Sequence, residues 1–306
     1  NFDIILLTAD KNINELLKQI KIFKVKNIIV TNYKKFLKIQ KILKDKKINI
    51  YNNFNSINKI LDNKKNDYVM NAITGLDGLK PTIQIIKFTK RIAIANKESI
   101  ICGWSLIQKE LLKYKTEFIP IDSEHFSIFK LLENQNLNDI KKIYITASGG
   151  PFLNYKPNQF KKITPREALK HPKWKMGKKI TINSSTLMNK IFELAEAQKL
   201  FDIPINKLDI LIHPNSLVHA IVMLKNGLVK FIYHETSMVI PIANAIFDGN
   251  LDIDNFLKDK NKGKKIKKNI ENLNFYKVDK KIFPVIKLKS RVNEYPSTSI
   301  IMNASN

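Results

Sequence analysis

Two carboxylates spaced two residues apart, and a third further along the chain, could together bind a hard cation. Asp122 and Glu124 lie in IPIDSEHFSIF, and Glu193 lies in a helical stretch that follows. If the strand that runs into Asp122 stays extended, its carboxylate and that of Glu124 point to the same side. A set of oxygen ligands without paired His or Cys favours Mg²⁺ or Mn²⁺ over zinc. The spacing also fits a site without a metal, in which Asp122 caps the next helix and Glu124 is solvated.

A candidate anion site lies in residues 171–198, where a polar loop leads into a long amphipathic helix. Apolar residues recur on one arc of that helix, and polar residues recur on the opposite arc. Ser184 and Ser185 stand where we expect the N-cap, which would direct free backbone N–H groups toward an anion. Asn189 and Lys190 follow within two turns, so a phosphate and a metal could both bind along this face. The alternative is an ordinary capped surface helix with a solvated Lys–Glu pair.

Two further polar features follow strand-like runs in the second half of the chain. Ser148 begins the segment SGGPF, whose two glycines allow the backbone to approach a ligand closely. His213 and His219 lie beside a predicted hairpin, in which the pair Asn226-Gly227 indicates a type I′ turn. We expect both histidines to be mainly structural.

Strand-like and helix-like patterns alternate through the first part of the chain. Near-continuous apolar strands separated by helical crossovers predict the α/β class, with a doubly wound, parallel, Rossmann-like sheet. Such sheets bind ligands beyond the carboxyl ends of their strands, which here lead into residues 8–12, 74–78 and 96–98. Each of these loops also fits ordinary helix capping. The six strand-like runs are residues 2–9, 26–32, 47–53, 67–73, 91–96 and 117–122.

The glycine-rich turn of a dinucleotide-binding fold does not occur in this sequence. That turn normally follows the first strand and holds the pyrophosphate on a helix N-terminus. No G-x-G-x-x-G motif occurs in the 306 residues, and the sequence begins inside a strand-like run. We therefore expect a strand, a glycine loop and a helix to precede residue 1. The last residues, SIIMNASN, read as the start of a helix, so we expect further sequence to follow.

The composition indicates a globular protein with a large positive charge. Only three of the 53 basic residues are arginines, and the formal net charge is +26. Base readout and bidentate phosphate contacts favour arginine, so we do not expect specific nucleic-acid binding. No run of 18 apolar residues and no signal-peptide pattern occurs, so we expect a soluble protein without membrane contacts. The lone Cys102, in an apolar helical context, excludes a disulfide framework and fits a reducing compartment.

The sequence contains several separate motifs, namely ANKES (95–99), PIDSEH (120–125), ASGGPF (147–152), HPKWKMGKKITINSST (171–186), NK..E (189–193) and LIHPNSLVHA (211–220). Together they resemble the 1-deoxy-D-xylulose 5-phosphate reductoisomerase family, which acts in the methylerythritol phosphate route to isoprenoids. The resemblance covers nearly the whole chain. It implies an NADPH-binding domain at residues 1–122, an α+β catalytic domain at 123–270, and at 271–306 a linker with the start of a helical domain. It also implies a homodimer in the bacterial cytoplasm or in a plastid-type organelle.

The resemblance also implies a role for each candidate residue. The divalent metal, Mg²⁺ or Mn²⁺, would be held by Asp122, Glu124 and Glu193, and the catalytic set would add Lys97 and His171. His171, Trp174 and Met176 would lie on a mobile loop that closes over the site. Substrate contacts would come from Ser123, Ser148, His171, Trp174, Met176, Ser184, Asn189 and Lys190. NADPH contacts would come from Ala9, Lys11, Asn12, Asn96, Lys97, Glu98 and Gly177.

The implied reaction converts 1-deoxy-D-xylulose 5-phosphate to 2-C-methyl-D-erythritol 4-phosphate. A metal bound by two neighbouring oxygens of this hydroxyketone sugar phosphate would polarise the C–O bonds during the rearrangement, and the resulting aldehyde would take a hydride from NADPH. Asp10 stands where a preference for NADPH favours an uncharged or basic residue, so NADH stays an alternative cofactor. Two other functions stay open. One is a different two-domain NAD(P)-dependent dehydrogenase of a phosphorylated substrate, and the other is a lysine-rich, non-catalytic binding protein.

Overall fold

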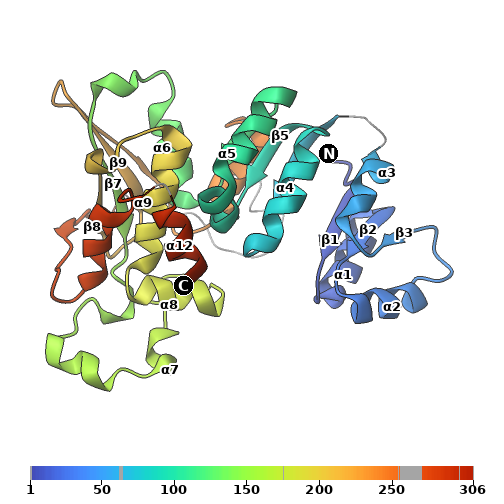
Figure 1. Ribbon diagram of the computed structural model, residues 1–306, viewed down its shortest axis with the longest axis horizontal. Coiled ribbons are helices and arrows are strands. Elements are labelled where there is room, and N and C mark those ends of the chain that lie inside the picture. The colour runs from blue at the N-terminus through green and yellow to red at the C-terminus, as the bar shows by residue number, and fades with distance from the viewer. Residues whose placement is uncertain are drawn as a thin grey trace.

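Three β-sheets organise the part of the chain that the computed structural model describes, which comprises residues 2–61, 65–174, 176–253, 255, 271–295 and 297–305 (Figure 1). The first two sheets have three parallel strands each, and the third has five strands of mixed direction. Among the described helices, none is both long enough and apolar enough to cross a membrane.

The first sheet is built from short strands and amphipathic crossover helices. Ile13, Leu16 and Ile20 recur at helical spacing and pack against Ile28 and Val30 of the middle strand. This burial places the first crossover helix on one face of the sheet. The elements are β1 (Leu6–Ala9), α1 (Ile13–Phe23), β2 (Asn27–Val30), α2 (Tyr33–Ile42), β3 (Asn49–Tyr51) and α3 (Ile57–Leu61), with strand order β1-β2-β3.

The second sheet has a middle strand that is buried on both faces. Ile92 and Ile94 pack into one core, while Ala93 packs on the opposite face against Ala245. Burial of both faces explains why this strand reads as a continuous apolar run. The elements are β4 (Asn66–Asn71), α4 (Leu79–Ile86), β5 (Thr89–Ile94), α5 (Lys97–Tyr114) and β6 (Glu117–Pro120), with strand order β4-β5-β6.

The α/β class and all six predicted strands are confirmed. Five of the strands are shorter than their apolar runs, whereas β5 is as long as its run but begins two residues earlier. The strands do not form one continuous sheet. Among the described strands, β1 pairs only with β2, and β4 pairs only with β5. No described strand pairs with both β1 and β4, so the parallel strands form two separate sheets.

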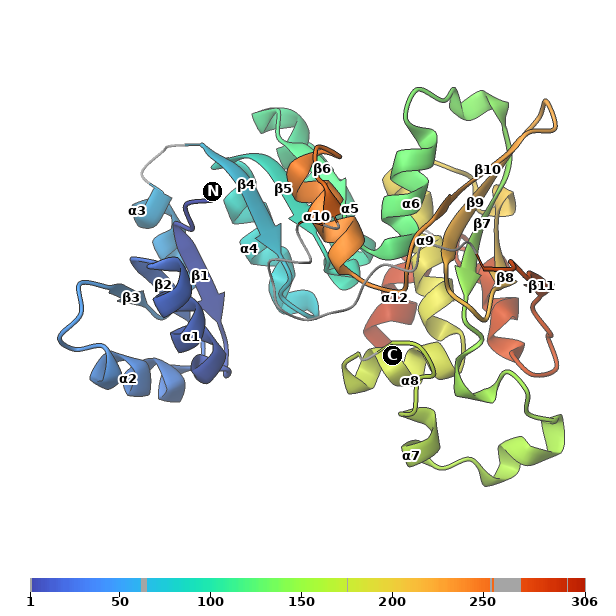
Figure 2. The same ribbon diagram turned by 180° about the vertical axis from the view of Figure 1, so that it is seen from behind.

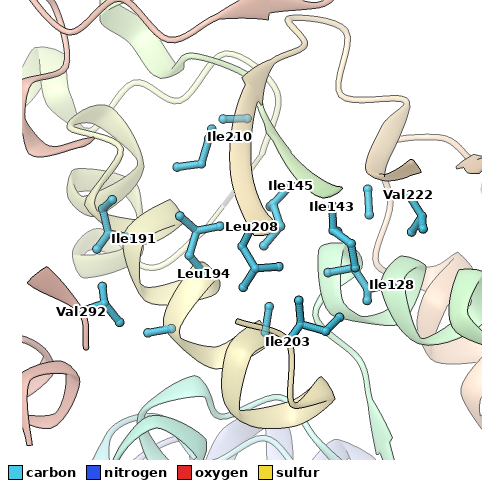
Figure 3. Packing of buried hydrophobic residues seen from close by; sticks show 14 of the residues in the cluster. Ile128, Ile143, Ile145, Ile191, Leu194, Ile203, Leu208, Ile210, Val222 and Val292 are labelled. Atoms are coloured by element: carbon cyan, nitrogen blue, oxygen red, sulfur yellow. The ribbon is translucent and has the colours of Figure 1, made fainter. Parts of the chain in front are cut away.

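The five-stranded sheet carries the largest core of the molecule (Figure 3). Ile143 and Ile145 of its central strand are fully buried, and Ile191 and Leu194 of a long helix belong to the same cluster. The strand order is β10-β9-β7-β8-β11, and only β7 and β8 are parallel. The elements are α6 (Ser123–Leu132), β7 (Ile140–Ala147), α7 (Pro165–Ala168), α8 (Lys178–Ser185), α9 (Met188–Phe201), β8 (Leu208–Ile212), β9 (Val218–Leu224), β10 (Val229–Tyr233) and β11 (Tyr276–Lys277).

The hairpin predicted after β8 is confirmed as β9 and β10, but its turn is not of type I′. A type I′ turn needs a positive φ at both central residues. Only Gly227 has one, at 90°, and Asn226 does not. The Gly227 N–H donates to Leu224 O at 3.2 Å, and the Leu224 N–H donates to Leu228 O at 2.9 Å. The strands are therefore joined by a longer loop with one left-handed glycine.

A helix that follows the hairpin, α10 (Val239–Phe247), packs against the second sheet and lies beside β6 (Figure 2). Ala245 of this helix joins the core on that face of the sheet. At the end of the helix, Asp248 lies 3.2 Å from the guanidinium of Arg91, which also contacts Glu117 at 2.7 Å. The third sheet is thus tied to the second by a packed helix and an ion pair.

The last described residues return to the third sheet. β11 pairs with β8 at the sheet edge, and Phe283 and Val292 are buried in the core of this sheet. The helix predicted at SIIMNASN is confirmed as α12 (Thr298–Ser305), which packs against α5. The domain boundary predicted at residue 270 lies outside the described residues, and the domain division stays a prediction.

Replacing Asn96 should destabilise the fold more than replacing another helix cap. Asn96 caps α5 by accepting from the Ser99 N–H at 2.8 Å, and its amide donates to Gly75 O at 2.7 Å and to Ile73 O. It is 3% exposed. Asn96→Ala removes the cap and both half-buried amide hydrogen bonds, so the free energy of unfolding should fall by about 2–3 kcal/mol in urea titration.

Asn12→Ala is the matched control, because Asn12 caps α1 at an exposed site with one bond to the Glu15 N–H at 3.2 Å. Loss of this cap should cost about 1 kcal/mol or less. Equal losses in the two variants would show that the amide bonds of Asn96 add nothing to its cap.

Candidate metal and phosphate site

The first two candidate metal ligands lie at the start of α6 and not on an extended strand. β6 ends at Pro120, and Asp122 is the N-cap of α6, where its side chain accepts from the Glu124 N–H at 3.3 Å. The expectation that Asp122 and Glu124 share one face of a strand is therefore wrong. A short acidic side chain before a helix satisfies one of its free N–H groups, and this ends the strand.

The three carboxylates nevertheless converge. Asp122, Glu124 and Glu193 each offer an oxygen, and these oxygens lie within 4.8 Å of one another. Glu193 is 1% exposed and Glu124 is 8% exposed, while Asp122 is half-buried. These candidate ligands come from two helices, α6 and α9, which pack together on the third sheet. An all-oxygen set of this kind suits a hard divalent cation.

Lys97, the first residue of α5, brings an ammonium group to these carboxylates. Its Nζ donates to Asn189 Oδ1 at 2.8 Å and lies 3.4 Å from Glu193 Oε1 and 3.6 Å from Asp122 Oδ2. Burial opposes its charge, but Glu193 and Asp122 outweigh burial and raise the pKa of Lys97 above its usual value. Lys97 is therefore cationic at neutral pH.

Lys190 brings a second ammonium group from α9 itself. Its Nζ lies 2.7 Å from Glu124 Oε1 and 2.7 Å from Glu193 Oε2. Burial opposes this charge too, and the two carboxylates again raise the pKa above its usual value. The cluster therefore places two buried cations against three carboxylates, which reduces the cost of burying the negative charges.

The two glutamates respond differently to this environment. Burial disfavours the charge of Glu124, but the Lys190 ammonium and the ring of His219 outweigh it, so the pKa of Glu124 lies well below its usual value. At Glu193, burial is the dominant cause and its pKa is raised. A cation bound among the three oxygens would favour the charged form of both.

The serine pair does not cap α9 as predicted. Ser184 and Ser185 form the last turn of α8, and the Ser185 hydroxyl donates to Ile182 O at 2.7 Å. The N-cap of α9 is Leu187, which has a φ of 64° and no capping side chain. The N-cap prediction is wrong because the residues before the serines form a helix of their own. The polar arc of α9 is also buried and not solvated, since Asn189 is 8% exposed.

The SGGPF segment nevertheless lies against these serines. Gly150 has a φ of 64°, and a Cβ on this residue would lie 3.1 Å from Ser184 O and 3.2 Å from the Cα of Ser185. Only a glycine therefore allows this close approach. Ser148 accepts from the Gly150 N–H at 3.2 Å, so its hydroxyl is held at the same place.

His171 links the loop before α8 to Ser148. Its Nδ1 accepts from the Trp174 N–H at 2.9 Å and the Lys173 N–H at 3.2 Å, so in the neutral ring the proton is on Nε2. This Nε2 lies 3.3 Å from the Ser148 hydroxyl, to which it can donate. Burial and then the charge of Lys190 lower the pKa of His171, which favours this neutral form. The structure thus brings together His171 of the predicted mobile loop and Ser148, which was predicted to bind the phosphate.

Comparison with known proteins identifies the family. A family model described as 1-deoxy-D-xylulose 5-phosphate reductoisomerase matches residues 1–103, and one for the C-terminal domain of that enzyme matches residues 118–201. The reductoisomerase of Pelagibacter ubique (strain HTCC1062) is 54% identical over 308 residues, which cover 100% of this chain and 78% of that protein. The enzyme of Sulfurihydrogenibium sp. (strain YO3AOP1) is 41% identical, covering 92% and 71%. The chain belongs to the 1-deoxy-D-xylulose 5-phosphate reductoisomerase family.

Solved structures of the reductoisomerase family have the same fold. A crystal structure of DOX-P reductoisomerase in complex with NADPH, fosmidomycin and magnesium matches with a TM-score of 0.87 at 29% identity, and covers 100% of this chain and 76% of that one. The enzyme from Zymomonas mobilis in complex with NADPH matches with a TM-score of 0.83, also at 29% identity, and covers 99% and 77%.

Two buried residues of this reductoisomerase-family chain lie behind the candidate metal ligands and were not singled out from the sequence. His125 donates from Nε2 to Glu193 O at 2.9 Å, and its Nδ1 lies 3.5 Å from both Asp122 Oδ1 and Glu196 Oε2. Burial opposes the charge of His125, but Glu196 outweighs it and raises the pKa to about 9. Burial raises the pKa of Glu196 to about 7. The spacing of three residues from Asp122 to His125, and from Glu193 to Glu196, was the available signal.

The two histidines expected to be structural have different surroundings. His213 is fully buried, with Nδ1 donating to Asn274 O at 2.8 Å and its ring stacked on Phe275. His219 lies at the site, with Nδ1 3.7 Å from Glu124 Oε1. The position of His219 beside a predicted hairpin did not indicate this contact, because Glu124 and His219 lie far apart in the sequence.

The predicted NADPH contacts lie at the carboxyl ends of β1 and β5 and before α8. The Asn96 side chain is hydrogen-bonded within the fold, and the Lys97 ammonium is paired with the carboxylates. The Lys11 ammonium is exposed, whereas Asp10 accepts from the Thr31 hydroxyl at 3.0 Å. The other positions are Ala9 at the end of β1, Asn12 at the cap of α1, Glu98 in the first turn of α5, and Gly177 at the start of α8. These contacts stay predictions, as do those of Ser123 and Met176.

Glu193→Gln should abolish the metal site and leave the fold intact, because it removes charge from the most buried of the three ligands. Loss of a residue that only orients a ligand typically lowers metal affinity 10–100-fold, so loss of a ligand should lower Mn²⁺ affinity by more than about a hundredfold in calorimetry. Glu196→Gln, one turn along the same buried face, is the control and should bind Mn²⁺ far better. If both variants bind Mn²⁺ like the unmodified protein, Glu193 is not a ligand.

Proposed function

We propose that this chain catalyses the NADPH- and divalent-metal-dependent rearrangement and reduction of 1-deoxy-D-xylulose 5-phosphate to 2-C-methyl-D-erythritol 4-phosphate. One observation carries this proposal beyond family membership. Asp122, Glu124 and Glu193 converge within 4.8 Å in a cluster that also contains the ammonium groups of Lys97 and Lys190. The reaction needs a cation at the hydroxyketone end of the substrate and positive charge near its phosphate.

The residues fit a divalent cation, since three carboxylate oxygens face one another and two of the three side chains are buried. When bound, the metal supplies Lewis-acid polarisation of the substrate's neighbouring oxygens, and NADPH supplies the hydride. Lys97 and Asn189, hydrogen-bonded to each other, hold Glu193 in place from one side. His125 holds the main chain of Glu193 from the other side, so the ligand geometry is set before substrate arrives.

The phosphate end of the substrate is assigned to the junction of α8, α9 and the SGGPF segment. Ser148, Ser184 and Lys190 supply two hydroxyl groups and one ammonium, and Asn189 adds an amide. Holding a phosphate that does not itself react orients the hydroxyketone for rearrangement. His171 joins this group to the loop that carries Trp174 and Met176, and closure of that loop would exclude water from the reacting carbons.

The cofactor is proposed to be NADPH and not NADH. Asp10 directs its carboxylate to the Thr31 hydroxyl, and the neighbouring Lys11 ammonium is exposed. The exposed Lys11 ammonium beyond β1 favours NADPH, which carries an additional phosphate. The Asp10 carboxylate, which accepts a hydrogen bond, repels that phosphate less than a free carboxylate would. We also propose that the protein acts in the cytoplasm of a bacterium, which is supported by its similarity to bacterial enzymes.

The activity test measures NADPH oxidation in the presence of 1-deoxy-D-xylulose 5-phosphate and Mg²⁺, with the product identified by mass spectrometry. Turnover should stop on chelation of the metal and return when Mg²⁺ is added. Lys190→Ala should raise KM about 10–100-fold, which is the effect expected for losing a charge-assisted hydrogen bond, and should lower kcat less.

Lys199→Ala, at the far end of α9, is the control for Lys190 and should leave KM unchanged. Turnover that continues without a metal would contradict the proposed function. Loss of metal binding in Lys190→Ala with normal substrate affinity would instead assign Lys190 to the carboxylates alone.

A second copy of the chain is proposed to pack on β10. This strand is at the edge of the third sheet, and Val229 and Phe231 are 50% and 46% exposed on one of its faces. Leu228, before the strand, is exposed as well. An exposed apolar edge strand favours pairing with another strand, and a homodimer would cover it.

Phe231→Lys should therefore weaken the dimer. A buried, unpaired charge in this face should raise the dimer dissociation constant at least about tenfold, as measured by analytical ultracentrifugation. Leu112→Lys places the same charge at an exposed apolar position on α5, away from the edge strand, and should have no effect. A dimer unchanged by Phe231→Lys and weakened by Leu112→Lys would place the interface on α5.

A further inference from the structure

His234, just beyond β10, is buried against the ring of His219. It is 7% exposed, and the two ring centroids are 4.2 Å apart with an interplanar angle of 18°. Its backbone N–H donates to Leu217 O at 2.9 Å, which fixes His234 beside the start of β9. The stack is therefore imposed by the pairing of β9 with β10.

The ring nitrogens of His234 do not explain why a histidine is buried here. Nδ1 donates to Glu235 O at 2.8 Å, which leaves Nε2 as an acceptor. This Nε2 is buried and has no hydrogen-bond partner among the described residues. A buried polar atom without a partner is unfavourable, so the contribution of His234 must come from its ring face. Burial, and then the His219 ring, lower the pKa of His234 to about 4, so the ring is neutral at neutral pH.

The ring of His219 contacts the site on its other sides. Its Nδ1 lies 3.7 Å from Glu124 Oε1, and the Trp174 ring meets it edge-on at 6.2 Å and 61°. Trp174 belongs to the loop between α7 and α8, which is also attached through His171 to Ser148. A continuous series of contacts thus runs from His234 through His219 to the loop at the phosphate end.

The geometry points to His234 as a positioning residue for the proposed reaction. It holds the His219 ring as the surface on which Trp174 settles when the loop covers the phosphate end of the substrate. This role rests on the proposed function, and His234 acts through His219 and Trp174, not through a substrate contact of its own. An aromatic pair of this kind changes an equilibrium about three- to tenfold, so substrate affinity should change by that factor.

Two substitutions separate the ring from its hydrogen bond. His234→Phe keeps an aromatic face for His219 and loses the donor to Glu235 O. His234→Asn keeps an amide donor near the position of Nδ1 and loses the ring. Both are made with Trp104→Phe, which leaves Trp174 as the only tryptophan. Trp104 packs on Phe118 and is not among the candidate site residues.

Stacking predicts that His234→Phe behaves like its parent. His234→Asn should raise the KM for 1-deoxy-D-xylulose 5-phosphate and the Kd of fosmidomycin about three- to tenfold, with kcat changed less than about twofold. The change in Trp174 fluorescence on fosmidomycin binding should shrink in His234→Asn and persist in His234→Phe. Mn²⁺ affinity should stay the same in both, because the three carboxylates are unchanged.

Fosmidomycin binding by His234→Asn that equals the parent overturns the proposal, and so does equal weakening in both variants. A merely structural role would lower the melting temperature without this difference in KM. Trp174→Leu provides a second measurement, since its effect on fosmidomycin affinity should be non-additive with that of His234→Asn. Additive effects would mean that the two residues are not coupled. If the parent itself neither binds fosmidomycin nor turns over substrate, the proposed function has failed, whereas a difference confined to the variants concerns His234 alone.

Discussion

The site depends on the packing of three carboxylates, two of them buried, against two ammonium groups. Taking a carboxylate out of water costs several kcal/mol, and removing one partner of a buried pair costs about 3–5 kcal/mol. Lys97 and Lys190 contact Asp122, Glu124 and Glu193 from two different helices. Each helix must therefore lie where its charged side chains can pair with those of the other helices. The starts of α5 and α6 and the second turn of α9 are therefore positioned by one set of charges.

The sequence was sufficient to predict the local elements. Apolar runs of six to eight residues, separated by amphipathic stretches, predicted all six strands of the first two sheets, because burial of a strand on both faces leaves a near-continuous apolar run in the sequence. The hairpin of the third sheet was predicted in the same way. The pairing of those strands was harder to predict. Contacts between segments far apart in the sequence decide which strands pair with β1 and β4, and the hydrophobic periodicity of the sequence does not reveal those contacts. The same limit applies to residues 178–185, where β-branched residues occur in a helix because tertiary packing overrides weak local preference.

The three candidate metal ligands do converge, although the geometry from which this was expected was wrong in detail. Two alternatives were open from the sequence for Asp122 and Glu124, a metal site at the end of a strand or a helix cap without a metal. In the structure, Asp122 caps the helix and still offers an oxygen to the cluster. A capping carboxylate has two oxygens, and an N-cap side chain lies beside the first turn, where Glu124 begins. His125, Glu196 and His234 were missed for a different reason. Each of these residues contacts a side chain from another element of the fold. In the sequence, a histidine or a glutamate indicates a buried structural group as readily as a functional site.

The charge cluster also joins the second sheet to the third. α5 begins directly after β5 and supplies Lys97, while Glu193 comes from α9, which packs along α5 and covers the third sheet. A second connection is made by α10 and the pair of Arg91 with Asp248. With two separate connections the sheets cannot rotate freely about either one. Under the proposed function, a group bound beyond β5 would thus be held at a fixed distance from the carboxylates, as hydride transfer to a metal-bound substrate requires. The ion pairs that reduce the cost of burying the carboxylates would thereby also fix the alignment of hydride donor and acceptor.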